Sequence, residues 1–142
     1  MDLSEEQRAF LVEPHIAVVC TNGPQGVPHA IPTWFFFEDG EVVMIAGRGS
    51  QRVRNLERDP AMTVVVDRRT IPYYSLTLSG RASIDPPPTP EESRRMATRY
   101  LGQYLGERYL QGRSGEGSVT VRLRPERAYE YRGVTLPLGA GR

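Results

Sequence analysis

The segment Ala46–Pro60 carries three arginines around the expected start of a short helix. Arg48 comes just before Ser50, and Arg52 and Arg54 follow it within the first helical turn. The N-terminus of a helix bears a partial positive charge, so it disfavours cations and attracts anions. The segment therefore predicts one of two arrangements. Either the arginines point into solvent, or they surround an anion such as a phosphate.

The residue types around this helix start suit an anion site. Ser50 is expected at the N-cap, with its hydroxyl and the free N–H groups of Gln51 and Arg52 directed outward. Gly47 and Gly49 would let a ligand approach the backbone closely. Arg52 would add a permanently charged, two-pronged donor.

The composition is that of an ordinary globular domain. The chain has 142 residues, of which 39% are hydrophobic and 25% are charged, and its formal net charge is +1. This length predicts one domain over residues 1–142, with an ordered core over about 4–132 and a frayed tail over 133–142. The near-neutral charge argues against nucleic-acid or membrane partners. The absence of a signal-like or membrane-spanning apolar run predicts a soluble, cytoplasmic protein.

The order of elements predicts a mainly β fold. Runs of β-branched residues alternate with short turn signals, which favours antiparallel pairing and closure into a small barrel of six or seven strands. The expected strands cover 15–21, 27–37, 41–46, 61–67, 73–84, 118–125 and 127–134. The expected helices cover 5–12, 50–58 and about 90–108.

The third helix has the clearest local signals. Thr89 and Glu92 form a capping box, with Pro90 at the first helical position. Apolar and aromatic residues then recur at helical spacing, which predicts one continuous stripe along the helix. The stripe consists of Met96, Tyr100, Leu101, Tyr104 and Leu105.

Several motifs occur in an order that resembles a known superfamily. A turn with Gly26 and Pro28 leads into a strand with Pro32, Trp34 and Phe35, and a hairpin, the Ser50–Arg52 helix start and Arg54–Leu56 with Asp59 and Pro60 follow. Over about residues 5–132 this order is similar to the pyridoxamine 5'-phosphate oxidase-like, FMN-binding split-barrel superfamily. The short chain and the sequence RNLERDP resemble its branch that uses the deazaflavin coenzyme F420.

The resemblance implies a split β-barrel that forms a homodimer, with the cofactor in a groove at the subunit interface. It assigns the cofactor's phosphate to Ser50, Gln51 and Arg52, and a tail of glutamates to Arg48 and Arg54. Many relatives have lysine at the position of Arg52. The residues expected along the ring system are Ile31, Pro32, Thr33 and Trp34, with Ala46 and Gly47 beneath it.

Hydride transfer in this superfamily is performed by the cofactor, so no catalytic triad is expected, and none is found. His29 is a candidate proton donor, or alternatively a partly buried strand histidine. Tyr73 and Tyr74 either face the substrate or the partner subunit, or alternate between core and solvent as neighbours on a strand do. No spacing of Cys, His and carboxylates predicts a metal site.

Three functions agree with this pattern. The first is an F420-dependent oxidoreductase that reduces a conjugated organic substrate. The second is an FMN-binding relative that acts as an oxidase or redox carrier. The third is a non-enzymatic module that binds a cofactor or a tetrapyrrole. A single-strand nucleic-acid barrel is disfavoured, because the aromatic residues cluster at 34–37 rather than alternate with a basic groove.

Overall fold

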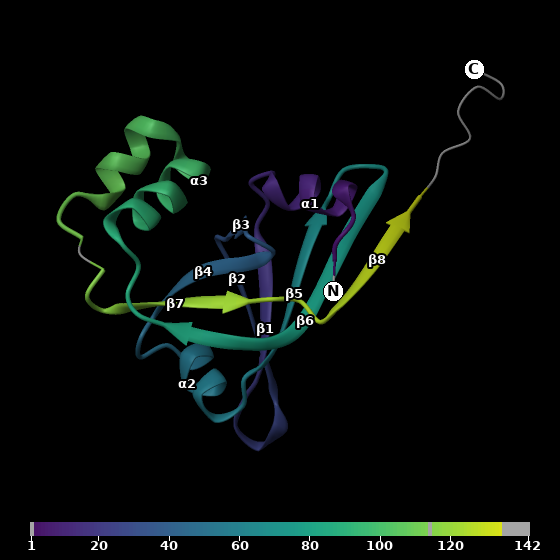
Figure 1. The fold of residues 1–142 in the computed structure, drawn as a ribbon, viewed down its shortest axis with the longest axis horizontal. Coiled ribbons are helices and arrows are strands. Elements are labelled where there is room, and N and C mark those ends of the chain that lie inside the picture. The colour runs from purple at the N-terminus through teal and green to yellow at the C-terminus, as the bar shows by residue number, and fades with distance from the viewer. Residues whose placement is uncertain (1, 114, 135–142) are drawn as a thin grey trace.

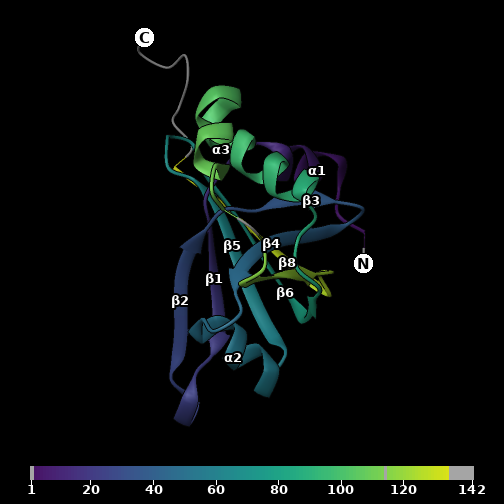
Figure 2. The same cartoon turned by 90° about the vertical axis from the view of Figure 1, so that its left-hand side faces the viewer.

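The computed structural model describes residues 2–113 and 115–134 and arranges them as a curled antiparallel sheet with helices at both ends (Figure 1). In chain order the helices are α1 (Glu5–Val12), α2 (Gln51–Arg58) and α3 (Pro90–Leu110). The strands are β1 (Ala17–Asn22), β2 (Pro28–Thr33), β3 (Phe36–Glu38), β4 (Glu41–Gly47), β5 (Ala61–Arg68), β6 (Tyr73–Asp85), β7 (Ser118–Leu123) and β8 (Arg127–Gly133). Figure 2 shows α1 and α3 at one end of the sheet and α2 at the other. The mainly β split barrel predicted from the sequence is confirmed.

All strand pairs are antiparallel, and β6 is common to both halves of the barrel. The strand order is β2-β1-β5-β6-β7-β4-β3, and β8 also pairs with β6. Residues 73–81 of β6 pair with β5 and β8, whereas residues 82–85 pair with β7. The sheet therefore turns from one half of the barrel to the other along β6.

Gly80 lies just before this change of partners. A Cβ atom added there would come within 3.0 Å of the Arg124 carbonyl oxygen, 3.2 Å of a Leu123 methyl and 3.3 Å of the Glu126 N–H nitrogen. The connection from β7 to β8 thus crosses β6 so closely that a side chain at this position would force its neighbours to shift. The Glu126 N–H donates to the Ser79 carbonyl at 2.8 Å and fixes this crossing.

The core consists of two clusters on opposite faces of β4. The main cluster fills the barrel with alternate residues of the central strands and is closed by Phe10 and Leu11 of α1. Its largest fully buried side chains include Phe35, Met44, Leu76, Leu78 and Leu123. The second cluster lies beneath α3 and contains Phe36, Val43 and Met96, with Trp34, Ile45 and Tyr100 packed against it.

The strand predicted over residues 27–37 is divided into β2 and β3, which brings the number of strands to eight. The division falls at Trp34 and Phe35. The Phe35 N–H donates to the Tyr100 hydroxyl at 3.0 Å, and that hydroxyl lies 2.9 Å from the Phe35 carbonyl oxygen. A side chain of α3 thus takes the place of the strand partners that Phe35 would otherwise need.

The continuous stripe predicted for the third helix is wrong beyond Gly102. This residue has φ +80° and ψ 172°, so the helix breaks there and turns. Met96 and Ala97 before the break are buried, whereas Tyr104 and Leu105 after it are 69% and 55% exposed. The capping box of Thr89 and Glu92 is present as predicted.

Two other sequence-based expectations concern the ends of the chain and the membrane. Residues 135–142 of the predicted tail lie outside the described residues, while Gly133 is part of β8. Within the part of the chain that the structure describes, no helix is both long and apolar enough to cross a membrane.

The close crossing at Gly80 generates a prediction about stability. We expect Gly80→Ala to lower the free energy of unfolding by about 1–3 kcal/mol, the usual cost of forcing a methyl group into filled space. Gly117→Ala is the matched control, because a Cβ there would meet nothing within 4 Å. Urea denaturation followed by circular dichroism measures both. Equal stability of the two variants would contradict the crossing as described.

Candidate functional site

The turn between β4 and α2 forms the predicted start of a helix. Ser50 is the N-cap residue, with φ −69° and ψ 157°, and α2 begins at Gln51. The Ser50 hydroxyl does not cap the helix, however, because it donates to the Gly47 carbonyl at 2.7 Å. No side chain caps the first turn, and that turn contains no acidic residue. The N-terminus of α2 therefore keeps its partial positive charge and its free donors.

The Arg52 side chain at this turn has a donor nitrogen without an acceptor in the described part of the chain. Its Nη2 donates to the Ile45 carbonyl at 3.2 Å, but its Nε is buried and has no hydrogen-bond partner among the described residues. Burial lowers the pKa of the Arg52 guanidinium, which nevertheless stays charged at neutral pH. A buried, charged donor without an acceptor fits the binding of an anion.

The backbone next to Arg52 is open. A Cβ atom added to Gly47 or Gly49 would meet nothing within 4 Å. Arg48 between them is exposed, and its N–H donates to the Gly117 carbonyl at 2.9 Å, which ties the turn to the segment before β7. The turn thus has room for a ligand and a fixed backbone.

Arg54 and the Gln51 side chain are engaged within α2. Arg54 contacts the Gly49 carbonyl and donates to Gln51 Oε1 at 2.7 Å. Gln51 Nε2 donates in turn to Asn55 Oδ1 at 2.7 Å. Arg54 therefore lies back over the turn, and Gln51 offers a ligand its backbone N–H rather than its side chain.

A groove of about 1020 Å³ lies between α3 and the β2–β4 region. This is the volume of a small-molecule site. Pro32, Thr33 and Trp34 line it, as the sequence predicts for the ring system of a cofactor. Its other lining residues are Ile16, Ile45, Pro88, Pro90, Ser93, Arg94, Met96, Ala97, Tyr109, Leu110, Arg113, Gly115 and Ser118. A smaller hollow of about 480 Å³ shares Ile16 and Pro32 with it.

Strand β4 joins the groove to the turn at the start of α2. Residues 47–52 of this turn are called the anion corner below, because they contain the predicted phosphate site. The Ile45 side chain lines the groove, while its carbonyl accepts the Arg52 hydrogen bond. Ala46 is only 2% exposed and points into the main core, so at this position only backbone can face a ligand. Ile31 is half-buried on β2 and is not part of the groove lining.

Sequence reasoning missed the contribution of α3 to this site. Met96 was predicted only as part of the helical stripe, and Ala97, Tyr109 and Leu110 were not singled out. The missing signal was Gly102, whose position inside a helical pattern marks a break. After this break the chain turns, and Tyr109 comes to lie against Trp34 at 5.5 Å between ring centroids.

Trp34 is held in the groove by Tyr100. The two rings are stacked, with centroids 5.1 Å apart and planes 6° from parallel. The Tyr100 hydroxyl accepts from the Phe35 N–H and can donate to the His15 carbonyl at 2.7 Å or to the Phe35 carbonyl. This hydroxyl therefore connects α3 to the residue His15 before β1 and to the residue Phe35 after β2.

The structure separates the remaining candidates from the groove. His29 is half-buried opposite Thr21 of β1, with Nδ1 buried and unpartnered, and it does not line the groove. Tyr74 is 4% exposed and donates to Glu130 Oε1 at 2.7 Å. Burial and this carboxylate raise the pKa of Tyr74. Tyr74 is thus a core residue, whereas Tyr73 is 40% exposed, as strand alternation requires.

The comparison with known proteins gives the family. The family model described as pyridoxamine 5'-phosphate oxidase matches residues 3–132, and the chain belongs to this family. No curated protein sequence matches the chain at a significant level.

Several solved structures share the fold. Protein Rv2991 of Mycobacterium tuberculosis is 24% identical with a TM-score of 0.74, and the match covers 99% of this chain and 96% of that one. A protein described as an F420 reductase is 22% identical with a TM-score of 0.73, over 89% of this chain and 98% of that one. A heme-binding protein from Mycobacterium smegmatis is 18% identical with a TM-score of 0.66, over 96% of this chain and 57% of that one.

The contacts of Tyr100 generate a prediction about the groove. Tyr100→Phe keeps the ring on Trp34 but leaves the Phe35 N–H without its acceptor. We expect a loss of about 1–3 kcal/mol in the free energy of unfolding, together with a red shift of the Trp34 emission as water reaches the groove. Tyr104→Phe removes a hydroxyl from an exposed ring of the same helix and should change neither quantity. An unaltered emission spectrum in Tyr100→Phe would contradict the positioning role of the hydroxyl.

Proposed function

We propose that the protein is an oxidoreductase that binds coenzyme F420, with the phosphate of the coenzyme at the turn between β4 and α2. The observation that carries this proposal is the buried Nε of Arg52, which lacks an acceptor next to an uncapped helix N-terminus. A phosphate oxygen would satisfy this donor and the free backbone N–H groups at once.

The residues of the corner and the groove divide the binding of the coenzyme between them. The N–H groups of Gln51 and Arg52, together with the Arg52 guanidinium, hold the phosphate. Ile45, Pro32 and Trp34 of the groove would hold the ring system, and their apolar side chains would exclude water. When bound, the deazaflavin supplies hydride transfer to a conjugated organic substrate.

The side chains of the groove suit a site in which the protein binds the coenzyme and the coenzyme performs the hydride transfer. The groove lining contains no carboxylate and no histidine within the described residues, which agrees with chemistry supplied by the cofactor. His29 stays a predicted proton donor that lies outside the lining. The exposed Arg48 is placed to meet the glutamate tail of F420 beyond the phosphate.

Two alternatives make different predictions for the bound ligand. FMN carries a phosphate but no glutamate tail, so it would use Arg52 without Arg48. The fold shared with a heme-binding protein supports a module that binds a tetrapyrrole without turnover. The F420 assignment is supported by the sequence motifs and by the fold shared with an F420 reductase over 89% of the chain.

The phosphate assignment is tested by titrating the protein with F420 and with FMN, followed by quenching of ligand fluorescence. We expect F420 to bind more tightly than FMN. We also expect Arg52→Ala to weaken F420 binding by about 1.5–3 kcal/mol, the range for a charge-assisted hydrogen bond. Arg52→Lys should restore part of this loss, because it keeps the charge but not the forked geometry.

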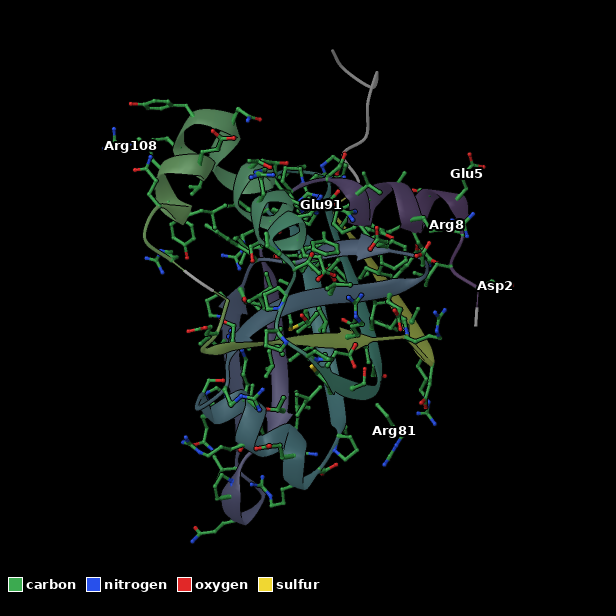
Figure 3. All side chains as sticks on the ribbon, turned by 60° about the vertical axis from the view of Figure 1, so that its left-hand side comes forward. Asp2, Glu5, Arg8, Arg81, Glu91 and Arg108 are labelled. Carbon is green, nitrogen blue, oxygen red and sulfur yellow. The ribbon has the colours of Figure 1, made fainter. Side chains whose placement is uncertain are left out.

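Arg81→Ala controls for the change in net charge. Arg81 is an exposed residue of β6 (Figure 3) that lies near Asp59 at the C-terminal end of α2, whereas Arg52 is at the N-terminal end. If Arg52→Ala binds F420 as tightly as the Arg81 variant does, the anion corner is not the coenzyme site. Tighter binding of FMN in the unaltered protein would support the FMN alternative instead.

We further propose that a second copy of the chain completes the groove. The barrel buries one face of β1, β5 and β6, while the other face carries Val18, Cys20 and Val65, which the described residues leave only half-buried. Tyr129 and Tyr131 of β8 are 66% and 52% exposed. This uncovered face continues into the smaller hollow, which Val18 also lines.

The dimer is tested by light scattering at micromolar concentration. We expect a homodimer, and we expect Val65→Arg to produce a monomer, because it places a charge at the centre of the uncovered face. The monomer should also bind F420 more weakly, since the groove lacks its second wall. Glu107→Arg, on the exposed distal part of α3, is the control and should stay dimeric. A monomeric unaltered protein would refute this arrangement.

A further inference from the structure

The groove beneath α3 has a charge pattern that the coenzyme does not explain. Arg94 and Arg113 are the charged residues of its lining. Neither guanidinium group makes an ion pair or a hydrogen bond within residues 2–113 and 115–134. The neighbouring arginines of α3 are engaged, since Arg95 donates to Glu38 at 2.6 Å and Arg99 donates to carbonyls at the end of α1.

The two arginines approach the groove from opposite ends of α3. Arg94 is in the second turn of the helix, where the adjacent Ser93 and the nearby Met96 and Ala97 also line the groove. Arg113 follows the helix, and its guanidinium lies 4.2 Å from the centre of the Tyr109 ring. One positive charge therefore comes from each end of the helix that covers the groove.

Aromatic and aliphatic side chains form much of the groove wall. Trp34 lies between Tyr100, which stacks on it, and Tyr109, which is tilted against it. Ile45 and Met96 add aliphatic surface. This surface favours aromatic and aliphatic ligand groups. The uncharged polar residues of the described lining are Thr33, Ser93, Tyr109 and Ser118, so only the two arginines there offer a full positive charge to an anionic group.

We infer that the groove takes a conjugated substrate that carries at least one anionic group, a carboxylate or another oxyanion, which Arg94 or Arg113 binds. This inference rests on the proposed function, because it names the substrate class of the same site. An uncharged conjugated molecule would fit the walls but would leave both guanidinium groups unused. A cationic one would be repelled.

Trp34 makes the test specific to the groove, because it is the single tryptophan of the chain. The probes are anilinonaphthalene sulfonate, a conjugated anion, and phenylnaphthylamine, the same ring system without the sulfonate. Binding is followed by quenching of Trp34 emission and by energy transfer to the probe, with no coenzyme present. We expect both probes to quench Trp34.

The double variant Arg94→Gln/Arg113→Gln should weaken binding of the sulfonate by about tenfold or more, as loss of charge-assisted hydrogen bonds does, and should change binding of the uncharged probe by less than about twofold. Arg108→Gln is the matched control, because Arg108 lies on the distal part of α3, outside the groove lining (Figure 3). It should leave both affinities unchanged. Ala97→Phe should weaken both probes, because it fills the groove itself.

Equal effects of the double variant on the two probes, or the absence of Trp34 quenching by the sulfonate, would overturn the inference. A titration with F420 separates this outcome from failure of the proposed function. The double variant should bind F420 within about threefold of the unaltered protein, because the phosphate site is at α2. If the unaltered protein does not bind F420 while binding of the sulfonate still falls in the double variant, the proposed function fails and the ligand class of the groove stands.

Discussion

The pairing of β6 with strands of both halves of the barrel is the constraint on which the positions of all other elements depend. Its first nine residues belong to one half, where they pair with β5 and β8, and its last four pair with β7 in the other half. The change of partners requires the β7–β8 connection to pass over Gly80. Because β7 pairs with β4, and β4 leads into α2, the course of β6 also decides where the anion corner lies.

The same constraint places α3 over the groove. This helix connects β6 to β7, two strands that are already paired, so it must leave the sheet and return to it. Arg122 of β7 fixes its beginning, through bonds of 2.8 Å to Glu92 and 2.9 Å to Asp85. Hydrogen bonding to the Thr89 backbone and to Arg122 lowers the pKa of Glu92, so this anchor stays ionised at neutral pH and weakens only in acid.

The parts of α3 before and after Gly102 are therefore held by different contacts. The part before Gly102 is fixed to the barrel by Arg122 and to α1 by Arg99, and it carries the buried Met96 and Ala97. The part after Gly102 exposes most of its apolar side chains, yet it brings Tyr109 to Trp34. One wall of the groove is therefore fixed by packing in the core, whereas the other is held in place by a few aromatic contacts.

Local signals predicted those features of the fold that depend on neighbours in the sequence. The capping box at Thr89 and the start of α2 after Ser50 require only residues three or four positions apart. The division of the strand at Phe35 could not be predicted in this way, since its cause is the hydroxyl of a residue 65 positions away. The same holds for Tyr109 in the groove, because its place depends on how the chain turns after Gly102.

The strongest argument that the corner at α2 is completed by a ligand comes from comparing two arginines. Arg52 and Arg99 each have a buried Nε without a partner. The other nitrogens of Arg99 donate to three carbonyls at the end of α1, so its charge is compensated within the chain. Arg52 has one bond of 3.2 Å, and its position next to a helix N-terminus adds repulsion rather than compensation. A folded chain keeps such an arrangement at a cost in stability, and an anion bound at the turn before α2, as proposed above, would offset that cost.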